Sequence, residues 1–362
     1  MKRIYKFDDN DSVVFRGDGE PRTAKTLLSR LNEFTENHQL LDDDFSLGGL
    51  VGQLENEMAA ILGKPAAIFM PTGTLANHLA IRRHAGTAGR AVVQEQSHIF
   101  NDTGDSIQRL SGINLVPLAQ NRVYFDTNEL DKAYRTSVTG RVLNPISVVS
   151  IETPVRRQYG QVVPWEHLVK LTEFCKTNEI QCHLDGARIF MQSAVTGKSV
   201  KEYSSLFDSV YVSLYKYLGT PFGSILAGEI EFIEGMFHER RMFGGGLANA
   251  SLIAALALNG LDGFEHKFSE SMQKASQLFP ALNELDHIQI HEFDHGSNIY
   301  RLAFSSSILV EDLIAELKKS GIFIYTEPSG EIYLHINATI LQRPNEEIIS
   351  AFSDAQAKSI KN

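Results

Sequence analysis

Apolar residues recur at helical spacing early in the chain. From Gly49 onward the apolar positions lie side by side or three to four residues apart, and a glycine follows the last of them. Such spacing puts the apolar side chains on one face of a helix, and a glycine readily ends a helix in the left-handed conformation. The pattern predicts an amphipathic helix that ends at Gly63, with Leu50, Val51, Leu54, Met58, Ile61 and Leu62 on its apolar face.

Beyond this helix, short apolar runs alternate with segments of helical periodicity. Short runs of this kind are typical of buried strands, and their alternation with helices indicates an α/β domain with a mostly parallel central sheet. We expect helices at 74–84, near Ser106 and at 164–176. The runs that we interpret as strands are AAIFM, AVV, INLVPL, ISVVSIE, QCHLD, SVYVSLY and GSILAG, between residues 66 and 228.

The C-terminal part of the chain has a smaller α/β pattern of its own. It follows a long helix, expected at 247–258, that ends the large domain, and it consists of the strand IYRLAF, a helix at 310–319 closed by Gly321, and the strands IFIYT and EIYLHI. The first residues instead form an irregular, partly acidic arm around one expected helix at 23–36. We therefore predict three parts, which are an N-terminal arm over 1–45, a large domain over 46–260 and a small C-terminal domain over 261–362.

Composition narrows the class of protein. With 43% hydrophobic and 22% charged residues, the chain of 362 residues is typical of a globular protein. A formal net charge of -10 argues against a general nucleic-acid binder, which needs clustered Lys and Arg to displace phosphate counterions. No apolar run approaches the roughly 18 to 20 residues that span a bilayer, and the basic N-terminus lacks the apolar segment of a signal peptide, so we expect a cytoplasmic protein. Cys175 and Cys182 have no zinc-ligand spacing around them and are expected to be reduced core residues; no metal site is expected.

The segment at 71–77 could bind a phosphate group. A strand ends there and a helix begins, so free backbone N–H groups and the hydroxyls of Thr72 and Thr74 point at one spot. The same hydroxyls could serve only as helix caps. The segment by itself leaves both interpretations open.

A carboxylate ends the strand QCHLD, on the side of the sheet where α/β folds build their binding sites. Asp185 needs a cationic partner there, and a protonated pyridinium nitrogen would be one. Arg188, three residues later, allows a second interpretation, which is a structural ion pair.

Two further residues follow apolar strands. Lys216 ends the run SVYVSLY and precedes glycine-rich turns. A lysine that burial keeps unprotonated offers an amine able to form a Schiff base, whereas a lysine at the end of a strand can also be solvated. His98 comes shortly after AVV, where its ring could stack on a flat cofactor or could be an ordinary loop histidine.

Taken together, these four clusters resemble the threonine aldolase and aromatic β-eliminating lyase family of fold-type I pyridoxal phosphate enzymes, in order and spacing from about residue 45 to residue 260. The resemblance implies an aspartate aminotransferase-like fold, pyridoxal 5′-phosphate as cofactor, and a homodimer or homotetramer with active sites shared between subunits, near which the segment RMFGGG at 241–246 would lie. It implies catalytic roles for Lys216, Asp185 and His98. In detail, it implies that Thr72, Gly73 and Thr74 bind the phosphate, that the ring of His98 stacks on the cofactor ring, and that Asp185 pairs with the ring nitrogen. It also implies that Lys216 forms the Schiff base and that Arg188 contacts the cofactor and the substrate carboxylate.

The chain departs from the family's pattern around the substrate. At four positions the usual serine, histidine, arginine and arginine are replaced; these positions are Gly17, Val155, Ala248 and Glu331. A planar guanidinium binds a carboxylate through two hydrogen bonds, so Arg156 and Arg157, or Arg343, could supply the missing cation, although each could also be a solvated surface arginine.

The resemblance implies cleavage of the Cα–Cβ bond of a β-hydroxy-α-amino acid to glycine and an aldehyde. The four replacements keep alternatives open, which are elimination at Cβ or another reaction at Cα, and a cofactor-binding protein with weak or no catalysis. Retention of Lys216, Asp185 and His98 favours an enzyme. Its expected partner is a small amino-acid substrate, with no nucleic acid or membrane partner.

Overall fold

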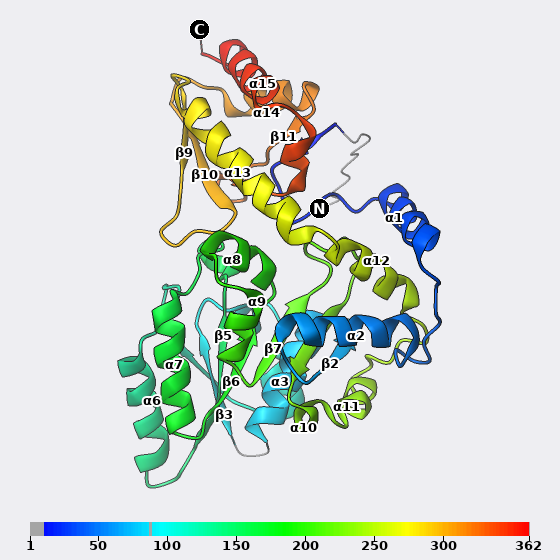
Figure 1. The fold of residues 1–362 in the computed structure, drawn as a ribbon. Helices are drawn as coiled ribbons and strands as arrows, with labels where there is room; N and C mark the ends of the chain where they lie inside the picture. Colours follow the sequence, from blue (N-terminus) through cyan, green and yellow to red (C-terminus); the bar gives the residue numbers. More distant parts are fainter. Residues whose placement is uncertain (1–10, 87–88, 362) are drawn as a thin grey trace. The chain divides into compact units, whose positions relative to one another are not determined.

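The computed structural model describes residues 11–86 and 89–361. The chain divides into two compact units, a large unit over Arg30–Gly260 and a small unit that combines residues up to Ser29 with those from Leu261 onward. The arm expected over 1–45 is thereby shared between the two units. Figure 1 shows the order of their helices and strands.

The large unit is built on a sheet of seven strands in the order β2-β8-β7-β6-β5-β3-β4. β7, β6, β5, β3 and β4 run parallel, whereas β8 is antiparallel to both of its neighbours. The predicted α/β class with a mostly parallel central sheet is confirmed. The strands are β2 Ala66–Met70, β3 Arg90–Gln94, β4 Leu115–Leu118, β5 Ile146–Glu152, β6 Gln181–Asp185, β7 Ser209–Ser213 and β8 Ser224–Gly228.

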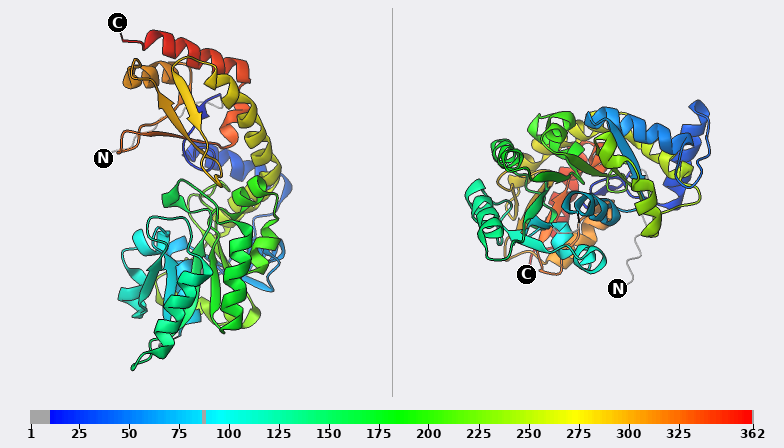
Figure 2. Two further views of the ribbon diagram at one scale, coloured as in Figure 1. Left: turned by 90° about the vertical axis from the view of Figure 1, so that its left-hand side faces the viewer. Right: turned by 90° about the horizontal axis from the view of Figure 1, so that it is seen from below.

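Helices cover both faces of this sheet, cyan on one face and green on the other in the left view of Figure 2. α3 packs against β5, β6, β7 and β8, while α7 packs on β6 and α2 on β2 and β8. The helices up to residue 261 are α1 Ala24–Asn37, which the boundary between the units divides, α2 Gly49–Leu62, α3 Gly73–Ala85, α4 His98–Asn101, α5 Ser106–Ser111, α6 Thr127–Thr139, α7 Trp165–Thr177, α8 Ile189–Thr196, α9 Val200–Ser205, α10 Ile230–Ile233, α11 Met236–Met242 and α12 Ser251–Leu261, with a 3-10 turn at Arg156–Gln158.

Local signals set several of these boundaries. α2 ends where the sequence predicts, because Gly63 adopts a left-handed φ of 64° and its N–H bonds back into the last turn. α12 begins at Ser251 rather than at residue 247, because the carboxylate of Asp43 accepts hydrogen bonds from the Ala250 N–H at 2.8 Å and the Ser251 hydroxyl at 2.7 Å. Cys175 and Cys182 are buried and form no disulfide, as predicted.

The small unit has its own hydrophobic core under an antiparallel sheet in the order β12-β10-β9. A two-residue parallel pairing joins β1 to β11, so the predicted strand IFIYT is strand only over its first two residues. None of the helices in the described part of the chain is long and apolar enough to cross a membrane. The elements are β1 Val13–Val14, α13 Phe264–Asn283, β9 Ile288–His291, β10 Ile299–Phe304, α14 Val310–Lys319, β11 Ile322–Phe323, β12 Ile332–His335, a 3-10 turn at Ala338–Gln342, and α15 Asn345–Lys358.

Candidate active site

Polar side chains gather at one edge of the large sheet because the carboxyl ends of its parallel strands meet there. β7, β6, β5 and β3 are neighbours and share one direction. Glu152 and Asp185 end β5 and β6 and lie opposite each other in the strand register. Lys216 follows β7 and His98 follows β3 within a few residues. The edge therefore carries three of the four clusters that the sequence singled out.

The carboxylate of Asp185 is buried, with 3% of the residue exposed. Oδ2 accepts a hydrogen bond from Nδ2 of Asn77 at 2.7 Å, and Oδ1 accepts one from the backbone N–H of Ala187 at 3.2 Å. Burial raises the pKa of this carboxyl group, and the charge of Lys216 opposes the rise. An ionised carboxylate is stable in such a place only beside hydrogen-bond donors and a cation.

Lys216 lies in the loop between β7 and β8, half-buried. Its charge lowers the pKa of both Asp185 and Glu152, and it contributes to the lowered pKa of His98. The loop that carries Lys216 begins at the same edge of the sheet at which β5 and β6 end in Glu152 and Asp185. The structure thus brings Lys216, Asp185 and His98 to one region.

His98 begins the short helix α4, and its backbone N–H donates to Oε2 of Glu152 at 2.5 Å. Its Nδ1 lies 3.5 Å from Oδ2 of Asp102. Burial lowers the pKa of the imidazole, against the opposing effect of the Glu152 charge. The ring is therefore neutral near pH 7, the state in which it stacks as an ordinary aromatic ring.

Glu152 is a member of this site that the sequence analysis missed. The residue is 4% exposed, and its Oε1 accepts a hydrogen bond from the backbone N–H of Arg156 at 2.9 Å. Burial and the neighbouring Asp185 raise the pKa of its carboxyl group. The signal was present, because a carboxylate ends the apolar run ISVVSIE just as Asp185 ends QCHLD. Asn77 was also missed, since its contact with Asp185 joins residues that are far apart in sequence.

The N-terminus of α3 follows β2 directly, as the sequence predicts. The hydroxyl of Thr72 accepts a hydrogen bond from the backbone N–H of Leu75 at 3.2 Å, so this threonine caps the helix. Gly73 is buried, and a Cβ atom there would lie only 2.0 Å from the hydroxyl of Tyr211 on β7. Glycine therefore lets the start of α3 approach β7, while Thr74 in the first turn is half-buried.

The predicted arginines differ in their surroundings. Nη2 of Arg156 and Nη2 of Arg157 both bond to Asp102, at 2.7 Å and 3.3 Å, and their side chains are 49% and 39% exposed. Arg188 immediately precedes α8, is half-buried, and contributes to lowering the pKa of Asp185. The residue that the sequence offered as a further cation, Arg343, lies in the small unit.

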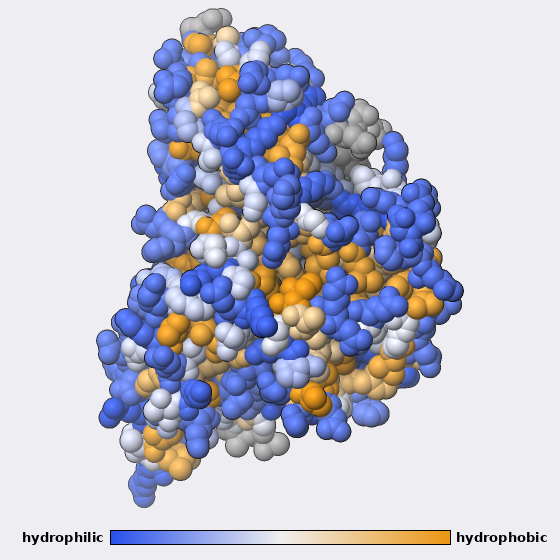
Figure 3. All heavy atoms as spheres, in the orientation of Figure 1, coloured by the Kyte–Doolittle hydropathy of each residue, from blue (hydrophilic) through white to orange (hydrophobic). Residues whose placement is uncertain are grey.

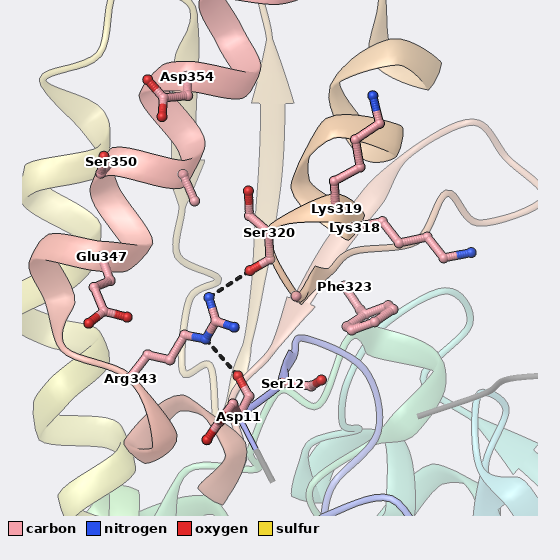
Figure 4. A pocket seen from close by; sticks show the side chains of 12 residues that line it. Asp11, Ser12, Lys318, Lys319, Ser320, Phe323, Arg343, Glu347, Ser350 and Asp354 are labelled. Carbon is pink, nitrogen blue, oxygen red and sulfur yellow. Dashed lines mark hydrogen bonds between the residues drawn. The ribbon is translucent and has the colours of Figure 1, made fainter. Parts of the chain in front are cut away.

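In the small unit, Arg343 binds backbone oxygen atoms (Figure 4). Its Nε and Nη1 donate to the carbonyls of Asp11 and Ser320, both at 2.6 Å. It lines a pocket of about 700 Å³ that also carries both lysines and carboxylates. The guanidinium thus ties the chain near its start to the end of α14.

The four replaced positions supply no cation. Val155 is fully buried and pairs with Gln161 in an isolated bridge, and the carbonyl of Ala248 accepts a hydrogen bond from the backbone N–H of Phe45 at 3.2 Å. Glu331 lies 3.7 Å from Nη1 of Arg301 and accepts from the hydroxyl of Tyr333. Gly17 adopts a left-handed φ of 80°.

This edge of the sheet has the features that pyridoxal 5′-phosphate needs. The buried acid Asp185 accepts hydrogen bonds from Asn77 and from the Ala187 N–H, and both contacts favour its ionised form. A neutral imidazole lies close by, and the helix N-terminus that carries the hydroxyls of Thr72 and Thr74 is adjacent. An amine lies in the same region. The residues present therefore fit this cofactor.

A family model for beta-eliminating lyases matches residues 36–304 of the chain. The chain belongs to this family. It is 33% identical over 236 residues to a low-specificity L-threonine aldolase of Candida albicans, and this match spans 62% of the chain and 60% of the relative. It is 27% identical over 348 residues to low-specificity L-threonine aldolase 1 of Arabidopsis thaliana, or 95% of the chain and 96% of the relative. A solved structure of a candidate L-allo-threonine aldolase from Listeria monocytogenes superposes with a TM-score of 0.80 at 25% identity, covering 96% of each chain.

These findings confirm the predicted family and the fold-type I architecture. The chain is a pyridoxal phosphate-dependent lyase of the threonine aldolase kind. The match to the Candida protein covers less than two thirds of that relative, whereas the Arabidopsis relative is covered almost completely.

Proposed function

We propose that this protein cleaves the Cα–Cβ bond of a β-hydroxy-α-amino acid and releases glycine and an aldehyde. The observation that carries the proposal is the meeting of Lys216, Asp185 and His98 at the carboxyl edge of a fold-type I sheet. Nearly full-length similarity to a low-specificity L-threonine aldolase supports this reaction over others. When bound, pyridoxal phosphate supplies an electron-withdrawing ring for chemistry at Cα.

Each residue then has a distinct task. The amine of Lys216 would hold the cofactor covalently and would move a proton at the substrate. Asp185 holds the proton on the ring nitrogen, and the ring of His98 stacks on the cofactor. The backbone and hydroxyls at the start of α3 bind the phosphate, and the residues involved are Thr72, Gly73 and Thr74.

Arg188 is our first choice for the substrate carboxylate. It is half-buried and near enough to Asp185 to lower its pKa. Arg156 and Arg157 share Asp102, which also lies beside His98, and both are more exposed to solvent than Arg188. We expect Arg188→Met to raise KM for the amino acid at least tenfold, because a charge-assisted bidentate contact contributes about 1.5–3 kcal/mol. A larger KM effect from Arg156→Met than from Arg188→Met would reverse this order.

We further propose that the enzyme works as a homodimer or homotetramer. The segment at 40–47 runs beside the segment at 241–252. Both segments expose apolar side chains there, which are those of Leu40, Leu41, Phe45, Leu47, Met242 and Leu252. Figure 3 shows apolar atoms at the surface over the region in which Figure 1 draws α11 and α12. Exposed apolar residues gathered in this way favour an interface between protein chains. Light scattering of the purified enzyme should give a multiple of the chain mass, and Leu252→Lys should lower it.

Product analysis tests the reaction directly. The holoenzyme is incubated with threonine, allo-threonine, phenylserine and tryptophan, and glycine, aldehydes, 2-oxo acids and ammonia are quantified. We expect equal amounts of glycine and aldehyde from at least one of the β-hydroxy amino acids. The second candidate is elimination at Cβ, which the description of the matching family favours. Formation of 2-oxo acid and ammonia without glycine would establish it in place of the aldolase reaction.

A further inference from the structure

A continuous line of buried hydrogen bonds leads from Asp185 to the far end of α3. Nδ2 of Asn77 lies 2.7 Å from Oδ2 of Asp185, and Oδ1 of the same amide lies 2.8 Å from Nε2 of His183. Nδ1 of His183 lies 2.8 Å from the hydroxyl of Ser209, which lies 2.7 Å from Nε2 of His84. The line crosses from α3 through β6 and β7, where His183 and Ser209 are register partners, and returns to α3.

Chemistry fixes the direction of every proton in this line. An ionised Asp185 can only accept, so the amide of Asn77 turns its N–H toward it and its oxygen toward His183. Nε2 of His183 must then carry the proton, which leaves Nδ1 as an acceptor for the Ser209 hydroxyl. That hydroxyl, having donated its proton, accepts from Nε2 of His84. All four donors therefore point toward Asp185.

The surroundings favour this arrangement. Asn77, His183 and Ser209 are fully buried at 0% exposure, and His84 is half-buried with its ring stacked on Phe232 at 4.6 Å. Burial lowers the pKa of His183 to about 3 and that of His84 to about 4, against a raising effect of Asp208 on His84 and with a further lowering by Arg83. Both imidazoles are thus neutral near pH 7, and a neutral imidazole can accept on one nitrogen while donating from the other.

We propose that His84, Ser209, His183 and Asn77 form a one-way hydrogen-bond relay that keeps Asp185 ionised opposite the ring nitrogen of the cofactor. Donors that point at an ionised group stabilise it, and aligned hydrogen bonds polarise one another in the same sense. The relay offsets the cost of burying the Asp185 charge. His84 and His183 are therefore positioning residues for a site that neither of them touches. This inference rests on the proposed pairing of Asp185 with the ring nitrogen.

The state of that nitrogen is measured directly. Holoenzyme is reconstituted with pyridoxal 5′-phosphate labelled with 15N in the ring, and the 15N chemical shift, which reports whether the ring nitrogen carries a proton, is followed over the whole pH range in which the protein stays folded. Ser209→Ala breaks the relay in the middle, and His84→Phe removes its first donor while retaining a ring to stack on Phe232. We expect each to lower the pH at which the nitrogen loses its proton by about 0.5–1 unit, and to lower kcat with little change in KM.

Two variants provide controls. His84→Gln keeps an N–H donor at the end of the side chain and should restore the behaviour of the original protein. His78 lies on the same helix, and its Nε2 is 2.7 Å from the hydroxyl of Ser111, a similar contact outside the relay. His78→Phe should leave the nitrogen signal unchanged. Fluorescence of Trp165, the single tryptophan, reports that each variant is folded.

The outcomes separate the relay from the assignment on which it depends. If Asp185→Asn moves the 15N signal while Ser209→Ala and His84→Phe do not, the relay is overturned and the proposed function stands. Equal behaviour of His84→Gln and His84→Phe would also overturn the relay. If Asp185→Asn leaves the signal unchanged, the proposed pairing fails and the relay fails with it. Should Ser209→Ala not fold, the comparison of the two His84 variants decides the question.

Discussion

Replacement of Gly73 by alanine tests the close approach of α3 to β7 at the proposed phosphate site. The added Cβ would lie 2.0 Å from the hydroxyl and 2.4 Å from Cζ of Tyr211, where ordinary van der Waals contact begins at 3.4 Å. Tyr211 is 3% exposed and is held within β7, so its ring has little room to move away. The first turn of α3 must shift instead.

We expect Gly73→Ala to destabilise the protein, although alanine usually stabilises a helix relative to glycine. In a helix, alanine is more stable than glycine by about 0.5–1 kcal/mol. The steric overlap acts in the opposite sense, and overpacking of a core costs about 1–3 kcal/mol. We therefore expect the free energy of unfolding to fall by about 1–2 kcal/mol. A shifted first turn also misplaces the phosphate-binding N–H groups, so Kd for pyridoxal phosphate should rise about tenfold, equivalent to about 1.4 kcal/mol.

Gly52, inside α2, provides a matched control. Apart from the adjoining residues and the backbone of its own helix, no atom of the described residues lies within 4 Å of its Cβ position, so Gly52→Ala should stabilise the protein by about 0.5–1 kcal/mol. Both variants are unfolded in urea without cofactor, with Trp165 in the large unit as the probe, and are titrated with pyridoxal phosphate by absorbance. A Gly73→Ala protein that matches Gly52→Ala in stability and binds the cofactor as tightly as the original protein would refute the packing argument.

Further predictions concern the lysine, a buried arginine and the response to pH. Lys216→Ala should lose the visible absorbance band that borohydride bleaches; a remaining reducible band would mean that another lysine carries the cofactor. Arg240 is fully buried and donates to the carbonyls of Phe69, Phe45 and Ser46. Arg240→Met should therefore lower the free energy of unfolding by about 3–5 kcal/mol, whereas Arg241→Met, at an exposed position, should change it by under about 1 kcal/mol. Similar urea midpoints for the two variants would contradict this prediction. In the folded protein the pKa values of His84 and His183 are about 4 and about 3, whereas in the unfolded chain both are near 6.5. Below about pH 6.5 the unfolded chain therefore binds more protons than the folded protein. The free energy of unfolding falls as the pH falls, by up to about 1.4 kcal/mol per pH unit for each histidine. His84→Phe should flatten that slope, and an unchanged slope would exclude His84 as a contributor.

The sequence predicted the elements that carry their own apolar signal. The strands that end at Glu152 and Asp185 are buried runs, and their shared direction follows from the alternation with helices. α6 was not predicted, although Asp126 and Glu129 form a capping box at its start, because the helix is mostly polar and its buried residues are only Leu130 and Ser137. The spacing of apolar residues therefore predicted the strongly buried elements, but it did not predict a helix that lies mostly in solvent.

Contacts between distant residues could not be predicted from the pattern. The start of α12 depends on a carboxylate at Asp43, and the surroundings of Asp185 depend on Asn77 from another element. The alignment of His183 with Ser209 exists only once β6 and β7 are paired in the right register. Residue type and spacing identified Asp185 and Lys216 as site candidates, while the network that supports them required the fold.

Backbone hydrogen bonds at Gly223 help to couple the two ends of the proposed cofactor site. The N–H of Gly223, which follows the Lys216 loop, donates to the carbonyl of Pro71, just before α3, at 3.2 Å, while its own carbonyl accepts from Leu214 at 3.1 Å. Gly223 adopts a φ of 110°, which side chains other than glycine rarely tolerate. When loops are exchanged between relatives of different substrate preference, residues 71–74 and 214–223 would therefore have to be exchanged together. Exchanging only one of the two segments would disturb the hydrogen bonds that join the Lys216 loop to the proposed phosphate site.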